Sequence, residues 1–95
     1  MDNLNDNRIK TYVDVNVDFD SAGDMKPRAI IFNDQSYKID KASKPIPAAS
    51  LKVGGQGDRY TITVLGQQSF LYFERNATLN GCNIGRWFVE EKQRF

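Results

Sequence analysis

Residues 9–19 have the sequence IKTYVDVNVDF, and this stretch decides the fold. The odd positions hold Ile, Thr, Val, Val, Val and Phe, whereas the even positions are mostly polar or charged. This period of two is typical of a β-strand that buries one face, because a helix would bring Asp14, Val15 and Asp18 together. Eleven residues also allow the strand to bend around a barrel.

Turn signals divide the rest of the chain into short segments. Asp20–Asp24 predicts a turn in which Gly23 takes a positive φ, and Asn33-Asp34 predicts a tight hairpin turn. Residues 41–50, KASKPIPAAS, contain two prolines and predict a connector without regular structure. Further strands are expected at residues 28–32, 35–40, 59–65, 69–75 and 86–91.

These six strands predict a single all-β domain, built as a small five- to six-stranded barrel or a rolled antiparallel sheet. We prefer an SH3-like barrel over an OB-like barrel, because the OB-like barrel usually has a helix where residues 41–50 lie. The predicted domain spans residues 9–91, between a flexible N-terminal tail at 1–8 and a C-terminal tail at 92–95.

Composition narrows the class of function. The chain has no histidine and one cysteine, which removes Ser-His and Cys-His catalytic pairs and argues against a zinc site, so we expect no enzyme and no cofactor. Cys82 has no partner for an internal disulfide and no apolar run approaches the roughly 20 residues of a membrane helix. Together with the polar N-terminus, these features predict a cytoplasmic protein without a membrane segment.

Charge is unevenly distributed along the chain. Residues 1–24 carry a net charge of −4 and residues 25–60 carry +4, although the total is only +1. A net charge of +1 differs from the strongly basic charge of proteins that bind duplex DNA. The acidic and the basic segment can together orient a charged partner. The acidic row Asp14, Asn16, Asp18 and Asp20 does not match a calcium loop, since Pro27 stands where the bidentate Glu is needed, and we interpret it as a solvated strand face.

Three short motifs carry a resemblance to known proteins. They are LKVGGQGDRY at residues 51–60, LYFE at 71–74 and RWFVE at 86–90. In these motifs the chain resembles a group of small uncharacterised proteins of Gram-positive bacteria, with the pattern LKxGGxGxRY, LxFE and RWFVE. The resemblance covers roughly residues 9–91 and implies a cytoplasmic location, but no activity.

The glycine-rich stretch is the first candidate surface. Gly54, Gly55 and Gly57 lie between Lys52 and Arg59, so backbone N–H groups and two cations could accept an anion. Nucleotide-binding loops of this kind precede a helix, whereas a strand follows here, and a flexible loop or barrel corner is the better interpretation.

Aromatic residues give the second candidate surface. Residues 69–75 are apolar on both faces and need cover, which residues 41–50, residues 76–85, a partner or a second copy could provide. Tyr72, Trp87 and Phe88, beside Arg86, are the expected anchors, and we predict a binding module for a protein partner or for self-association. The alternative is single-stranded nucleic acid, bound through residues 52–59 and exposed aromatics such as Tyr12 and Phe88.

Overall fold

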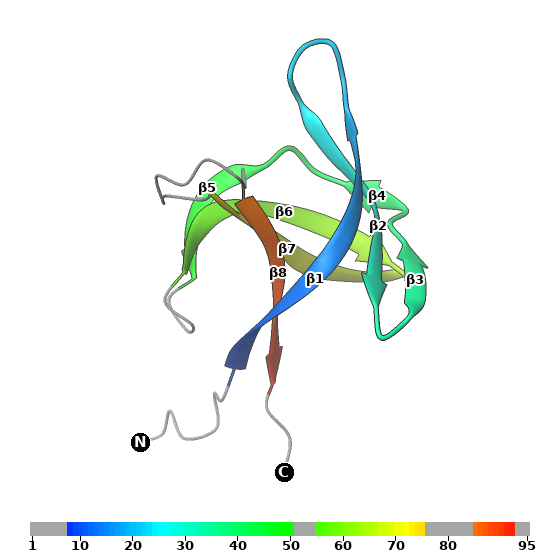
Figure 1. The fold of residues 1–95 in the computed structure, drawn as a ribbon, viewed down its shortest axis with the longest axis vertical. Helices are drawn as coiled ribbons and strands as arrows, with labels where there is room; N and C mark the ends of the chain where they lie inside the picture. Colours follow the sequence, from blue (N-terminus) through cyan, green and yellow to red (C-terminus); the bar gives the residue numbers. More distant parts are fainter. Residues whose placement is uncertain (1–7, 51–54, 76–84, 93–95) are drawn as a thin grey trace.

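The computed structural model describes residues 8–50, 55–75 and 85–92, and within these ranges the chain is all-β (Figure 1). No helix occurs among these residues, and therefore none that could cross a membrane. The strands are β1 (Arg8–Phe19), β2 (Met25–Phe32), β3 (Gln35–Lys38), β4 (Lys41–Ala42), β5 (Ile46–Ser50), β6 (Gly55–Val64), β7 (Gln67–Arg75) and β8 (Gly85–Lys92).

The strands form one antiparallel sheet that curls on itself. Its order is β3-β2-β1-β8-β7-β6-β4. β5 lies outside this path: it pairs with residues 55–59 of β6, whereas β4 pairs with residues 62 and 63 of the same strand. The two ends of this path, β3 and β4, are separated in the chain by Ile39 and Asp40 alone. The Ile39 N–H donates to the Arg28 carbonyl on β2, and the Asp40 N–H donates to the Thr63 carbonyl on β6. Residues 35–42 therefore join the two ends of the sheet, which confirms the predicted small barrel or rolled sheet.

The alternation in β1 is present as predicted. Thr11, Val13, Val15 and Val17 are half-buried, and the three valines pack against a core of Ile30, Ile39, Tyr60, Ile62, Leu71, Phe73 and Trp87. The strand changes partner at its middle: residues 8–13 pair with β8, and residues 14–19 pair with β2. The two ends of the predicted apolar face depart from the pattern, because Ile9 and Phe19 lie outside the core and are 44% and 65% exposed.

The turn residues behave as their chemistry requires. Gly23 has a φ of 90°, and Asn33 and Asp34 have φ values of 52° and 63° in the β2–β3 hairpin. The β6–β7 turn uses Leu65 and Gly66, with φ values of 52° and 77°. Left-handed backbone at Leu65 is strained for a residue with a β-carbon.

The predicted irregular connector at residues 41–50 is wrong. Lys41–Ala42 pairs with Thr63 and Ile62 of β6, and Ile46–Ser50 pairs with residues 55–59 of the same strand. Pro47 is compatible with β5 because that strand bonds to β6 alone, and a proline without an N–H is tolerated on an edge strand.

The strand expected at residues 69–75, apolar on both faces, lies inside the sheet. β7 lies between β6 and β8, and Leu71, Tyr72 and Phe73 are all buried. Leu71 and Phe73 belong to the core on the inner face, and Tyr72 points to the outer face. In β8, likewise, Trp87 packs in the core and Phe88 lies on the outer face.

Candidate functional site

One row of side chains crosses the outer face of the sheet. The register aligns Ile46 on β5, Arg59 on β6, Tyr72 on β7, Phe88 on β8 and Tyr12 on β1. Because directly paired residues share a face, these five side chains form a continuous strip over five strands. We call this strip the outer row.

The centre of the outer row is an aromatic stack. The rings of Tyr72 and Phe88 lie parallel at 4.8 Å between centroids, and the Tyr12 ring meets Phe88 edge-on at 6.0 Å. The Lys10 Nζ lies 4.9 Å from the Phe88 centroid. Phe88 is fully buried as a result, with no exposed fraction.

The predicted aromatic anchors are therefore wrong as surface residues. Tyr72, Trp87 and Phe88 are all buried, and Trp87 faces the core, where it contacts Tyr60 and Phe73. Tyr12 and Lys10 on β1 cover Phe88 within the same chain, whereas Phe70 on the outer face of β7 is 44% exposed. Of the cover predicted at residues 76–85, positions 76–84 lie outside the described residues. The sequence did not predict the burial of Phe88, because an alternating pattern within one strand does not indicate that β1 pairs with β8.

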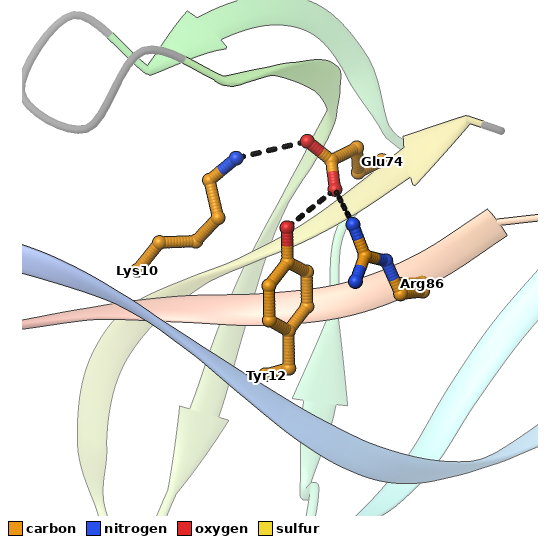
Figure 2. A network of polar contacts seen from close by, with 4 residues as sticks. All are labelled: Lys10, Tyr12, Glu74 and Arg86. Carbon is orange, nitrogen blue, oxygen red and sulfur yellow. Dashed lines mark hydrogen bonds and ion pairs between the residues drawn. The ribbon is translucent and has the colours of Figure 1, made fainter. Parts of the chain in front are cut away.

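A polar network lies beside the stack, as Figure 2 shows. The Glu74 carboxylate on β7 accepts hydrogen bonds from the Lys10 Nζ at 2.9 Å and from the Tyr12 hydroxyl at 2.7 Å. The Arg86 guanidinium lies 3.4 Å from the same carboxylate, and its carbon lies 4.0 Å from the Tyr12 centroid. Three strands are thus tied together by one carboxylate.

The network shifts the titration of its two central members. The Lys10 hydrogen bond is the largest cause that holds the pKa of Glu74 below its usual range, ahead of the opposing effect of burial. The hydrogen bond with Glu74 likewise raises the pKa of Lys10. Both side chains are about one-fifth exposed, at 20% and 19%. Their charges are therefore paired with each other, and the arrangement resembles a cross-strand tie more than a reactive centre.

Arg59 forms a second cation–aromatic contact on the outer face. Its guanidinium carbon lies 4.5 Å from the centroid of Phe70, which is 44% exposed. Its Nε is buried and has no hydrogen-bond partner among the described residues. Burial raises the pKa of the neighbouring Tyr72 hydroxyl, so that hydroxyl remains protonated.

The glycine-rich stretch is a strand rather than a loop where the structure describes it. Lys52 and Gly54 lie outside the described residues, and Gly55 and Gly57 belong to β6, where they pair with Ser50 and Ala48. A Cβ added to Gly57 would overlap the Phe73 carbonyl oxygen. Glycine is needed there for close backbone approach.

The described residues line an apolar pocket and a larger polar cleft. A pocket of about 200 Å³ has apolar walls that include Val13, Ile62 and Val89. A cleft of about 870 Å³ lies between the β1–β2 hairpin and residues 39–45, and both Lys and Asp side chains line it. The described residues hold no cluster of three or more His, Cys, Asp or Glu that could bind a metal ion.

Among the described strands, the β1–β2 hairpin leaves one edge of residues 14–19 unpaired, and we call this edge the open edge. Figure 1 shows the end of this hairpin projecting beyond the curled sheet. β2 pairs with one edge of residues 14–19, and no described strand pairs with the other edge, because the β1–β8 pairing ends at Val13 and Trp87. Where β1 leaves β8, a notch of about 380 Å³ is lined by residues 12–15 and 85–87.

Comparison with known proteins gives no match: no family model, curated protein or solved structure is significantly similar to this chain.

Proposed function

We propose that this domain is a non-catalytic module that binds another protein. The observation that carries the proposal is the edge of β1 at residues 14–19, which has no strand partner within the described ranges. Such an edge presents a row of N–H and C=O groups that can pair with an added strand. The exposed phenyl ring of Phe19, at 65%, lies at the end of this edge.

Photocrosslinking from defined positions tests the proposal. A photoreactive amino acid replaces Asn16 on the open edge, Phe70 on the outer face, or Ser36 on β3 as a control, since all three positions are exposed. We expect discrete protein adducts from position 16 in cells that produce the full chain, and none from position 36. An absence of protein adducts from every position would overturn the proposed function.

Single-stranded nucleic acid is the second candidate. Tyr12 and Phe70 are 40% and 44% exposed, and each carries an arginine on its ring, which is a common arrangement for contacts with bases and phosphates. It ranks second because Glu74 lies among these cations and because Phe88, expected to be exposed, is buried. Titration with a short oligonucleotide should then shift Tyr12 and Phe70 signals in a salt-dependent way, and unchanged spectra at low salt would contradict it.

We also propose that the barrel is of the SH3-like kind and acts in the cytoplasm. The support for the first is that residues 39–45 connect strands without a helix, whereas an OB-like barrel usually has one. The support for the second is a single cysteine, which fits a reducing compartment. An experimental structure and cell fractionation would test these two statements separately.

A further inference from the structure

We infer that the open edge of β1 binds an extended segment of a different protein in which Lys or Arg alternates with apolar residues, and that it rejects a second copy of this chain. The inference rests on the proposed protein-binding function and specifies the partner. Its basis is the side-chain pattern along residues 14–19.

The two faces of this edge differ in chemistry. Asp14, Asn16 and Asp18 are exposed on one face, and Val15 and Val17 are half-buried against the core on the other. A strand added to the edge continues both faces, because directly paired side chains lie on the same side of the sheet. Its side chains beside the aspartates would be solvated, and those beside the valines would extend the apolar face.

Charge complementarity defines the solvated side of the partner. Asp14 has no ion pair with any described residue, and Asp18 has only an exposed one, 3.0 Å from the Arg28 Nε. Opposite charges at directly paired positions of two strands stabilise the pair, whereas like charges destabilise it. Basic residues at every second position of the partner would therefore face both aspartates.

A second copy cannot satisfy this pattern in a symmetric dimer. Two identical edges related by a twofold axis pair antiparallel. The two residue numbers of each directly paired couple then add up to the same value along the whole pairing. If that sum is even, acidic positions face one another; centred on Asn16, for example, Asp14 of each copy opposes Asp18 of the other. If the sum is odd, the valines of one copy fall on the acidic face of the other.

Head-to-tail pairing with the first half of β1 is also disfavoured. Residues 9–13 do alternate, with Lys10 and Tyr12 on one face. However, the Lys10 ammonium and the Tyr12 hydroxyl already bind Glu74, at 2.9 and 2.7 Å. Both groups would have to leave that carboxylate to reach another copy.

The notch beside β8 is the position at which we expect the partner strand to start pairing with β1. Its lining includes Asp14 and Val15 of β1 on one side and Gly85 and Arg86 of β8 on the other. Since β1 separates from β8 there, an incoming strand can pair along residues 14–19 without displacing any described strand.

Peptide binding to the full chain tests the inference. The probe is a capped seven-residue peptide with Lys at the odd positions and Val or Thr between them. Two controls have the same length: one carries Glu in place of each Lys, and one groups the lysines into a block. We expect the alternating basic peptide to bind at least tenfold more tightly than either control. Among residues 14–19, the amide protons that point to the open edge should become protected from exchange.

Charge reversal on the protein gives a matched comparison. The double variant Asp14→Lys, Asp18→Lys should prefer the Glu peptide, because both positions are exposed and face the partner. The control variant Asp24→Lys, Asp40→Lys makes the same change in net charge at two other exposed aspartates and should keep the original preference. Sedimentation of the free protein should show a monomer.

Three results would overturn the inference: equal binding of the three peptides, protection outside residues 14–19, or a dimer whose interface includes this edge. None of these would by itself contradict protein binding, because crosslinking at position 70 could still reveal a partner on the outer face. The inference and the proposed function can thus fail separately.

Discussion

The two halves of β1 have the same alternating pattern and different surroundings. In the first half, Lys10 and Tyr12 project onto a folded surface, where they cover Phe88 and bind Glu74. In the second half, Asp14 and Asp18 project into solvent beside an edge without a described strand partner. The difference shows that a strand pattern specifies which face is buried, whereas the neighbouring strands decide whether the other face stabilises the fold or remains available for binding.

The largest effect that tests this contrast comes from aromatic truncation. Phe88→Ala removes a fully buried ring between Tyr72 and Tyr12 and should lower the free energy of unfolding by about 3–5 kcal/mol. Phe19→Ala, at a 65% exposed ring, should change it by about 0.5 kcal/mol or less. Urea denaturation of both variants measures the difference, and equal losses would show that the second half is as integrated as the first.

Removal of one charge in the first half should have a moderate effect. Glu74→Gln leaves Lys10 and Tyr12 without their charged acceptor and should lower the free energy of unfolding by about 1–3 kcal/mol. Urea denaturation at neutral pH provides the measurement. A change near zero would mean that the network in Figure 2 contributes nothing to stability.

Acid should remove the same contribution from the wild-type protein. Hydrogen bonds hold the folded pKa of Glu74 below its value in the unfolded chain, which is about 4.3, so its stabilising effect is complete above that pH. The effect is lost as the pH falls through the lowered folded pKa. The stability difference between wild type and Glu74→Gln should therefore shrink in acid; a constant difference would contradict this assignment.

The smallest effect is expected in the second half of β1. Asp18→Asn breaks an ion pair with Arg28 whose side chains are 64% and 63% exposed, and solvent screens such pairs strongly. The free energy of unfolding should change by about 0.5 kcal/mol or less, and added salt should make this change smaller still. A loss as large as that of Glu74→Gln would remove the distinction between the two halves.

Much of the fold could be predicted from local chemistry. Three features depend on neighbours in sequence and agree with the structure: the alternation over residues 11–18, the turn residues Gly23, Asn33 and Asp34, and the doubly apolar strand at 69–75. The strand at 46–50 was missed because Pro47 argues against strands in general, and only its edge position makes it acceptable.

The site could be predicted far less well. Lys10 and Glu74 are 64 positions apart, and their contact depends on the order β1-β8-β7, which no local pattern specifies. For the same reason Phe88 was expected at the surface, although Tyr12 covers it from a strand more than 70 residues away in the sequence. The alternating pattern placed Lys10 and Tyr12 on the polar face of their strand, but it did not indicate that both would bind Glu74.

The pairing of Arg8 with Lys92 has a mechanical consequence. β1 and β8 are antiparallel neighbours near the two chain ends, so a force applied to those ends acts across the ladder rather than along it. The hydrogen bonds between these strands would then break one after another, beginning at Arg8 and Lys92 and proceeding toward Val13 and Trp87. The domain should therefore unzip at low force, and a pull between residue 19 and residue 92 should meet greater resistance.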